Sequence, residues 1–344
     1  MGRSIALAIV GFGGVGRAFA RLLLEKKSLV EKAAGSEVHV AFIADSRGLV
    51  GSHEGLDWGL VERALAAPRG SVSMLPGGRP GASVYEAIDE MRPDILVDAT
   101  PSIYQGDLPK VKRGWYEAVL GYGGFVVTAS KDVLALWCGE LSGGGWGLRL
   151  LYKASIMAGT PLADMLRWGF KGRDVRLLRG VLNGTTNFVL GLVERGYRLD
   201  EAVEEAVARG YAEPDPSADL KGLDLAAKAS IATCSLEAHV PLYSVRIESV
   251  VDSSVEGMVA SALSRGLRVK YVAEAGRGWA RVRLVEVPQG DPLYSVDGPG
   301  NAVVVETGEG VIEVRGPGAG YEAAASALFS DVMIAAELLG VGLP

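Results

Sequence analysis

The hexapeptide GFGGVG at residues Gly11–Gly16 fits the pattern G-x-G-x-x-G and directly follows an apolar run. An amphipathic segment follows, so the glycines are expected to lead from a buried strand into a helix. In that context the first glycine permits a tight turn, the second lets the backbone approach a pyrophosphate, and the third allows close helix packing. A plain strand-to-helix turn is the alternative. The candidate cofactor contacts are Gly11, Phe12, Gly13, Gly14, Val15 and Gly16.

The rest of the first half continues this strand-and-helix alternation. Strands are predicted at 5–10, 38–44, 95–99, 125–128 and 148–152, and helices at 17–26, 57–66, 84–91, 109–120 and 133–141. Repeats of this kind are typical of a parallel sheet with both faces covered. We therefore expect a Rossmann-like nucleotide-binding domain at 1–152.

The pattern changes after residue 152. Predicted helices cluster at 160–168, 183–195, 200–209 and 220–235, and two hairpins follow at 267–287 and 302–315. Hairpins separated by glycine-containing turns indicate an antiparallel or mixed sheet. The expected fold class is thus α/β, with a second α+β domain at 153–317 that contains a mixed sheet. A last helix is predicted at 320–339.

Composition narrows the possible partners. Hydrophobic residues make up 49% of the 344 residues, and the net charge is −6. This balance provides a sizeable core but no basic surface for nucleic acid or an anionic membrane. No apolar stretch is expected to reach the roughly 20 residues that span a bilayer. We expect a cytoplasmic protein that acts on small molecules. Cys138 and Cys234 are expected to be buried free thiols, with a single disulfide between them as the alternative.

Two further loops follow predicted parallel strands, where ligands bind in such sheets. In the first, Asp45 could accept a hydrogen bond from an adenosine ribose hydroxyl, and Arg47 could pair with a 2′-phosphate. These two side chains favour NAD and NADP respectively, so the preferred cofactor stays open. The candidate contacts in these loops are Asp45, Ser46, Arg47, Ala99, Thr100 and Pro101.

Asp224 and Lys228 are the candidate proton-transfer pair. They are four residues apart, so on a helix they share one face, and the neighbouring residues are apolar. A lysine in such a setting needs a partner, and its pKa is easily moved. An exposed ion pair is the alternative, but Glu213 and Asp219 precede the pair and add charge. Lys131, in VVTASK after a predicted strand, is a second candidate; a routine helix-start lysine is its alternative.

Several motifs together resemble homoserine dehydrogenase. The resemblance rests on GFGGVG, VVTASK, ASIMAGTPL at 154–162, RGVLNGTTNFVL at 179–190, GYAEPDPSADLKGLDLAAK at 210–228, DPLYSV at 291–296 and GPGAG at 316–320. It covers nearly the whole chain. It implies reversible, nicotinamide-dependent reduction of L-aspartate 4-semialdehyde to L-homoserine, a step of threonine and methionine biosynthesis.

The resemblance also implies individual roles. Lys131 and Lys228 would flank the reacting oxygen, with Asp224 beside them. The remaining assignments are Glu213 and Asp219 to the substrate ammonium, Gly184, Thr185 and Tyr211 to the substrate site, and Ser130, Lys131 and Gly318 to the cofactor. A homodimer through the second domain, a C-terminal segment 318–344 that rejoins the first domain, and the absence of a C-terminal regulatory domain are implied as well.

Two positions depart from the family pattern. The family commonly has a glutamate that helps to hold a monovalent cation where this chain has Lys153, so no metal site is expected. The family usually has asparagine where this chain has Ser130, next to Lys131. These departures leave open a second hypothesis, an NADPH-binding sensor or assembly protein with little turnover. A phosphorylating semialdehyde dehydrogenase is disfavoured, because neither cysteine has the context of a catalytic nucleophile.

Overall fold

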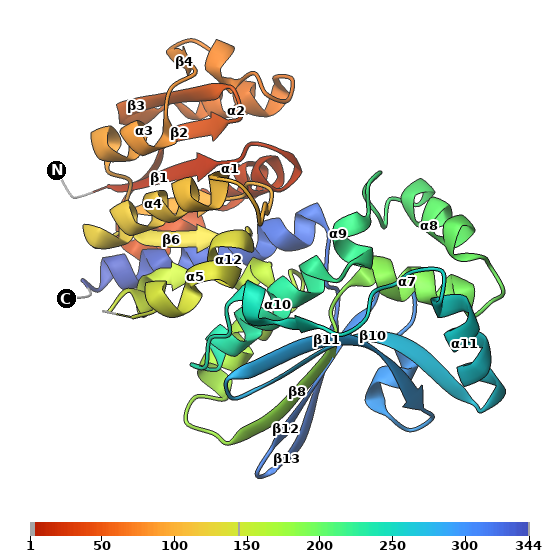
Figure 1. Cartoon of the computed structure of the whole chain (residues 1–344). Coiled ribbons are helices and arrows are strands. Elements are labelled where there is room, and N and C mark those ends of the chain that lie inside the picture. Colours follow the sequence, from red (N-terminus) through yellow and green to blue (C-terminus); the bar gives the residue numbers. More distant parts are fainter. Residues whose placement is uncertain (1–3, 144, 343–344) are drawn as a thin grey trace. The chain divides into compact units, whose positions relative to one another are not determined.

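A computed structural model describes residues 4–143 and 145–342; the outermost ends of the predicted first and last segments, 1–3 and 343–344, lie outside the described residues. The chain divides into two compact units (Figure 1). Unit 1 consists of Met1–Val133, Glu140–Ser155 and Gly320–Pro344, and unit 2 of Leu134–Gly139 and Ile156–Ala319.

Unit 1 contains a seven-stranded sheet in the order β4-β3-β2-β1-β5-β6-β7. The strands are β1 (Ile5–Val10), β2 (Val38–Asp45), β3 (Gly48–Leu56), β4 (Gly78–Pro80), β5 (Ile95–Asp98), β6 (Phe125–Thr128) and β7 (Leu150–Leu151). The five strands from β2 to β7 in this order pair in parallel, whereas β3 and β4 join antiparallel at one edge. The parallel strands are almost wholly buried because helices cover both faces, as α/β sheets require.

The helices of unit 1 are α1 (Gly14–Ala34), α2 (Trp58–Ala66), α3 (Val84–Met91), α4 (Leu108–Gly121) and α12 (Tyr321–Gly340), with short turns η1 (Val72–Met74), η2 (Trp146–Arg149) and η3 (Lys153–Ser155). Helix α5 (Asp132–Leu141) begins and ends in unit 1, and its middle, Leu134–Gly139, belongs to unit 2. The chain reverses its direction of travel across the sheet between β1 and β5, so the loops that follow these two strands are adjacent. That is where open parallel sheets bind ligands.

Helix α12 corrects the expectation about apolar stretches. It is a single helix of 20 residues, long and apolar enough by composition to span a bilayer, but half of its most apolar window is buried within the protein. It packs against α1, although the two helices stand at opposite ends of the sequence (Figure 1). Its apolar character is therefore explained by packing within unit 1.

Unit 2 contains a six-stranded mixed sheet in the order β13-β12-β8-β10-β11-β9. The strands are β8 (Val175–Val181), β9 (Arg246–Ile247), β10 (Leu267–Gly276), β11 (Trp279–Pro288), β12 (Asn301–Thr307) and β13 (Gly310–Gly316). Both predicted hairpins are present, as β10–β11 and β12–β13, and only β9 pairs in parallel. The fold class predicted from the sequence is thus confirmed.

The helices and turns of unit 2 are α6 (Leu162–Asp164), the π-helical turn η4 (Met165–Gly169), α7 (Gly184–Val193), α8 (Leu199–Ala208), α9 (Ser217–Leu220), α10 (Leu223–Ser235), η5 (Leu242–Ser244), α11 (Val255–Ser264) and η6 (Pro292–Ser295). Helices α7, α10 and α11 all contact β10. Helix α10 is buried from Leu225 to its last residue, Ser235.

Cys138 and Cys234 form a disulfide, so the expectation of free thiols was wrong. Cys138 lies in α5 and Cys234 near the end of α10, with their Cα atoms 6.1 Å apart. That separation falls within the range that a disulfide spans. The two apolar helices that made the thiols look like isolated core residues pack side by side, a proximity that their positions 96 residues apart in the sequence do not reveal.

Candidate active site

The glycine-rich loop has the shape that a dinucleotide requires. Ala99 N donates to Val10 O at 2.8 Å, which places the loops after β1 and β5 side by side. Gly11 has a φ of 90°, and a Cβ there would meet the backbone of Ala99 and Thr100, whereas a Cβ on Gly16 would overlap Gly11 O. Gly13 by contrast faces open space. The turn is therefore tightly packed on its inner side and open on the side where a pyrophosphate would approach.

Helix α1 begins directly at this loop, with Gly14 as its first residue. The ring of Tyr321, from the start of α12, lies against Gly14, where a Cβ would come within 2.8 Å of the ring. Tyr321 itself is 56% exposed. Sequence reasoning missed this residue, because only the folded chain brings the first turn of α12 to the first turn of α1.

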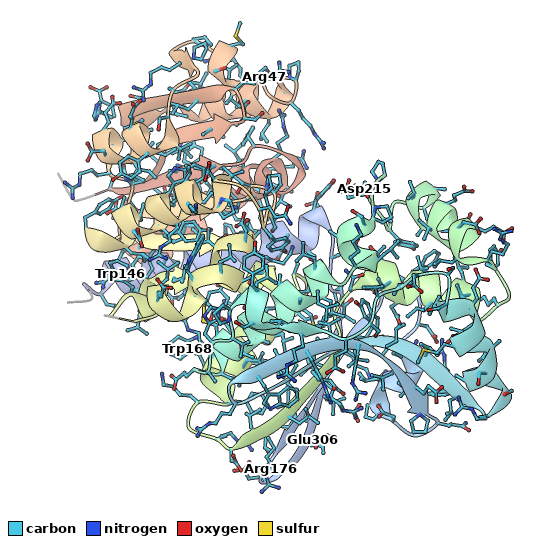
Figure 2. All side chains as sticks on the ribbon, viewed as in Figure 1. Arg47, Trp146, Trp168, Arg176, Asp215 and Glu306 are labelled. Atoms are coloured by element: carbon cyan, nitrogen blue, oxygen red, sulfur yellow. A yellow bond between two sulfur atoms is a disulfide. The ribbon has the colours of Figure 1, made fainter. Side chains whose placement is uncertain are left out.

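The loop after β2 holds its carboxylate by backbone contacts. Asp45 accepts hydrogen bonds from Arg47 N at 2.8 Å and from Val72 N at 3.0 Å. Burial and the charge of Arg69 lower the pKa of Arg17, while Asp45 acts in the opposite direction, so these charged groups are neighbours. Arg47 projects from this loop as an exposed side chain (Figure 2). Cationic groups thus accompany the carboxylate at the predicted ribose end of the site.

The loops after β5 and β6 are joined to each other. Lys131 N donates to Ser102 Oγ at 2.9 Å. Thr100 donates from both its backbone N and its hydroxyl to Asp98, at 2.8 and 2.6 Å. Ser130 is fully buried beneath these loops, whereas Lys131 is partly exposed. In unit 1 the structure therefore brings together the predicted residues Ala99, Thr100, Pro101, Ser130 and Lys131.

In unit 2, Asp224 and Lys228 form a buried ion pair and not an exposed one. Lys228 Nζ lies 2.8 Å from Asp224 Oδ2 and donates to Leu182 O at 2.6 Å. The lysine side chain is 10% exposed and the aspartate side chain 17%. Among the described residues, these two contacts use two of the three N–H groups of the ammonium, so a third donor is available to a ligand.

Asn183 connects this pair to a second carboxylate. Its Nδ2 donates to Asp219 Oδ1 at 2.6 Å and to Asp224 Oδ2 at 2.9 Å. Burial, followed by the charge of Asp224, raises the pKa of Asp219, although Asn183 and Lys228 oppose the shift. Sequence reasoning assigned no role to Asn183. Its only signal was its place in RGVLNGTTNFVL, before the predicted glycine and threonine contacts.

The predicted substrate-site residues differ in how well their contacts are defined. Thr185 Oγ1 donates to Tyr211 O at 2.7 Å, and the Tyr211 ring lies 4.7 Å from the ring of Phe188. A Cβ on Gly184 would come within 2.8 Å of Pro299 O. Glu213 is exposed, and no contact among the described residues joins it to Asp219. The structure therefore groups the predicted residues except Glu213.

Gly318 lies against a buried amide. A Cβ on Gly318 would overlap the side chain of Asn301, which is 4% exposed. Neither Nδ2 nor Oδ1 of that side chain has a hydrogen-bond partner among the described residues. Asn301 was not predicted from the sequence, since it opens a strand that otherwise reads as an ordinary hairpin arm.

Lys153 has a structural partner. Its Nζ lies 3.2 Å from Asp331 Oδ1 and 3.0 Å from Ser330 Oγ, both in α12, and its backbone N donates to Asp331 Oδ2 at 2.9 Å. The lysine therefore neutralises a carboxylate that is buried in the last helix.

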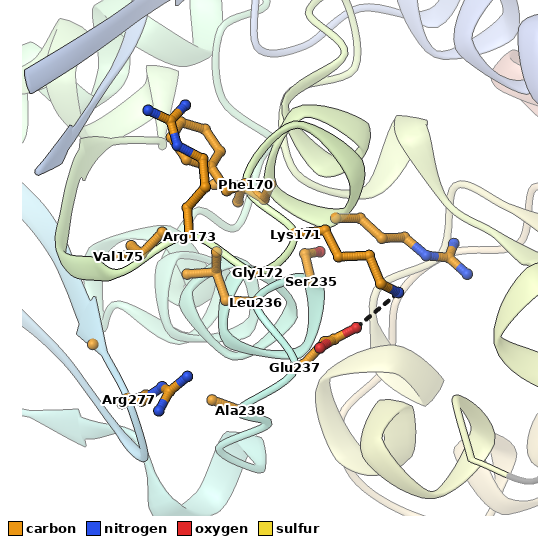
Figure 3. A pocket seen from close by; sticks show the side chains of 13 residues that line it. Phe170, Lys171, Gly172, Arg173, Val175, Ser235, Leu236, Glu237, Ala238 and Arg277 are labelled. Atoms are coloured by element: carbon orange, nitrogen blue, oxygen red, sulfur yellow. Dashed lines mark ion pairs between the residues drawn. The ribbon is translucent and has the colours of Figure 1, made fainter. Parts of the chain in front are cut away.

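A separate pocket of about 400 Å³ lies in unit 2 and contains none of the predicted site residues. Four cationic side chains line it, but Lys171 pairs with Glu237 at 3.0 Å, and Arg173 and Arg277 extend to different sides (Figure 3). A binding pocket normally has polar groups that converge on one ligand. We therefore do not assign the reaction to this pocket.

Comparisons with known proteins agree with the geometry. The model of the homoserine dehydrogenase family matches residues 161–333. A homoserine dehydrogenase of Sulfurisphaera tokodaii is 32% identical over 95% of this chain and 97% of its own length, and an NAD(+)-dependent homoserine dehydrogenase of Pseudomonas canavaninivorans is 33% identical over 95% of each.

Solved structures show the same relationship. A hyperthermophilic archaeal homoserine dehydrogenase in complex with NADPH has a TM-score of 0.78 and 27% identity, covering 99% of both chains. A putative homoserine dehydrogenase of Archaeoglobus fulgidus has a TM-score of 0.80 and 27% identity, covering 96% of this chain and 98% of its own. Family model, relatives and fold thus agree that this chain belongs to the homoserine dehydrogenase family.

Proposed function

We propose that the chain catalyses the reversible, NAD(P)-dependent reduction of L-aspartate 4-semialdehyde to L-homoserine. The observation that carries the proposal is the buried cluster of Asp219, Asp224 and Lys228, connected by Asn183. It places an ammonium donor and two carboxylates within one small region, as a substrate with an aldehyde and an ammonium group requires. Family membership supplies the reaction class.

Lys228 is the proposed proton donor to the aldehyde oxygen. Asp224 and Leu182 O hold its ammonium in place, at 2.8 and 2.6 Å, and leave one N–H for the substrate. Bound NAD(P)H supplies the hydride for the aldehyde carbon. A positioned acid of this kind typically contributes about 10² to 10⁴ in rate. In the reverse direction the same lysine, as the neutral amine, accepts the hydroxyl proton of homoserine.

Asp219 is the proposed partner of the substrate ammonium. It is mostly buried and borders Asp224, so its negative charge gains from a nearby cation. Glu213, which is exposed, is proposed as a second partner of the substrate ammonium. Gly184, Thr185 and Tyr211 form the remaining proposed contacts.

The cofactor is proposed to bind along the loops that follow β1, β2, β5 and β6. The open side of Gly13 and the start of α1 would hold the pyrophosphate. Lys131 and the small residues at 99–101 would border the nicotinamide. Arg47, which is exposed in the loop after β2, favours NADP over NAD, because a 2′-phosphate gains charge-assisted hydrogen bonds from a guanidinium group.

The finer organisation is proposed as follows. Unit 1 serves as the dinucleotide-binding domain, with 318–344 returning to it, and unit 2 binds substrate and pairs with a second copy through its sheet. The enzyme is expected in the cytoplasm, in threonine and methionine biosynthesis. No monovalent cation is proposed, since Lys153 already occupies the position of the family glutamate and pairs with Asp331.

Homoserine-dependent reduction of NADP and of NAD by the purified chain tests the proposal. We expect turnover with both homoserine and, in reverse, aspartate semialdehyde, and a lower KM for NADP than for NAD. Tight binding of NADPH without turnover of either substrate would contradict the proposal and support a sensor.

A further inference from the structure

A fully buried lysine on α4 lies beneath the proposed nicotinamide loops. Lys112 has no exposed surface, and its Nζ lies 2.7 Å from both carboxylate oxygens of Asp132. It also donates to Ser130 Oγ at 2.5 Å and to Pro101 O at 3.4 Å. A second carboxylate, Asp98, lies 3.8 Å away and is equally buried.

These contacts join the two loops, which we define as the β5 loop (residues 99–103) and the β6 loop (residues 129–131). Lys112 contacts Pro101 in the β5 loop and Ser130 in the β6 loop. Asp132, its ion-pair partner, also accepts a hydrogen bond from Ile103 N at 3.0 Å. One cation therefore contacts both loops directly and again through its counter-ion.

Asp98 extends the same network to the other side. It accepts two hydrogen bonds from Thr100, and Tyr116, one turn after Lys112 on α4, donates to it at 2.6 Å. Burial, and then the charge of Asp98, raises the pKa of Tyr116 well above its ordinary value, so the tyrosine keeps its proton. Helix α4 thus supplies the ammonium of Lys112 to Asp132, next to the β6 loop, and the hydroxyl of Tyr116 to Asp98, next to the β5 loop.

Stability alone does not account for this arrangement. A buried ion pair is often no more stabilising than well-packed apolar residues of the same volume. Here the contacts converge on two loops that are also joined by the hydrogen bond from Lys131 N to Ser102 Oγ, and Lys112 adds a buried cation to that connection. Lys112 and Asp132 thus connect the β5 loop to the β6 loop, the two segments that would border the nicotinamide.

We propose that Lys112 is a positioning residue for cofactor binding. It holds the β5 and β6 loops in the spacing that accommodates the nicotinamide and keeps Lys131 in place at the end of the β6 loop. This inference rests on the proposed function, because it assumes that these loops contact NAD(P).

The test measures the Kd of NADPH by its fluorescence for wild type, Lys112→Met and Lys153→Met, each checked for folding by circular dichroism and Tm. Lys112→Met removes the ammonium but keeps the volume, so we expect the Kd to rise roughly tenfold to hundredfold, since small misplacements weaken a fitted site steeply. Lys153→Met is the matched control. It removes a buried lysine from an ion pair in the same unit, so it should lower Tm while the Kd stays within about twofold.

Asp132→Asn provides a milder variant in case Lys112→Met does not fold, with an expected rise in Kd of roughly threefold to tenfold. A folded Lys112→Met or Asp132→Asn protein with wild-type Kd would overturn the inference. So would an equal loss of affinity in Lys153→Met, because it would point to a general loss of stability.

The assay separates the two proposals. Wild-type protein that binds NADPH but turns over neither substrate would refute the proposed function, while the Kd comparison would still decide the role of Lys112. Wild-type protein that binds neither NADPH nor NADH would refute both.

Discussion

Asn183 and Lys228 contact the two neighbouring carboxylates of the candidate site. Asp219 and Asp224 share the amide of Asn183, and Lys228 pairs with the second of them. Two neighbouring carboxylates repel each other in a partly buried site, and burial and the charge of Asp224 raise the pKa of Asp219, while Asn183 and Lys228 oppose the shift. A substrate cation beside Asp219 would oppose it further.

Arg47 is expected to control the choice of cofactor. Replacing it with alanine removes an exposed cation beside Asp45, so the KM for NADPH should rise by about tenfold to hundredfold and that for NADH should change little. Steady-state kinetics with each cofactor measures this. Arg176→Ala is the control, because this exposed arginine of unit 2 pairs with Asp174, two residues earlier in the chain. Equal changes in both KM values for Arg47→Ala would refute the role.

Lys270 gives a pH dependence of stability. Burial, followed by the charge of Arg268, lowers its pKa from 10.5 to about 8, against the opposing charges of Glu194 and Asp297. Its Nζ donates to Val296 O and Asn187 Oδ1, both neutral groups. Between about pH 8 and 10.5 the unfolded chain keeps the proton that the folded chain has lost, so stability rises with pH in this window.

Comparison with Lys270→Met isolates this effect. The free energy of unfolding of wild type relative to the variant should rise by up to about 3 kcal/mol between pH 8 and pH 10.5. Urea denaturation at several pH values in this range measures the difference. A difference that is independent of pH would show that Lys270 titrates normally.

At the scale of elements, the sequence predicted most strands and helices because their patterns are local. The run of apolar residues in β1 and the alternation in β10 and β11 need no knowledge of distant contacts. Strand β3 was missed, since its composition, GLVGSHEGL, resembles a loop and its strand character comes from pairing with β2. Strand β8 was missed for a similar reason, because it is a single central strand among helices.

Sequence patterns predicted the site residues that lie close together in the chain, but not those that folding brings together. Residues within one helix or turn, such as Asp224 with Lys228, follow from spacing alone. Asn183, Lys112 and Tyr321 could not be found this way, because each acquires its neighbours from a distant segment. The disulfide was mispredicted for the same reason.

The disulfide is expected to contribute substantially to stability. It joins α5 to α10 across a sequence separation of 96 residues, and such bonds typically contribute about 2–5 kcal/mol. Reduction should therefore lower Tm clearly, as measured by thermal melts with and without a phosphine reductant. A Cys138→Ser, Cys234→Ser double variant should have the same Tm as the reduced wild type, and the reductant should not change that Tm. An unchanged Tm in wild type with both thiols shown to be free would contradict this. Disulfides are uncommon in the cytoplasm of mesophiles. For a mesophilic protein, the bond therefore argues against the proposed cytoplasmic location.

At the scale of the whole molecule, the chain is expected to act as a homodimer. Its sheet in unit 2 is covered by helices α7, α10 and α11 where they meet β10, and the partner is proposed to cover the opposite face. Light scattering after size exclusion should give twice the chain mass of 36.0 kDa. A mass of one chain across the concentrations used for activity would exclude this assembly.

The central claim is that the buried pair of Asp224 and Lys228 performs the proton transfer of homoserine oxidation. The most direct measurement compares kcat for homoserine-dependent NADP reduction in wild type, Lys228→Met and Lys221→Met. Lys221 is an exposed lysine seven residues earlier, at the end of α9, so its loss should leave kcat unchanged. The account predicts a fall of about 10² to 10⁴ in Lys228→Met alone; a folded Lys228→Met enzyme with near wild-type kcat would contradict it.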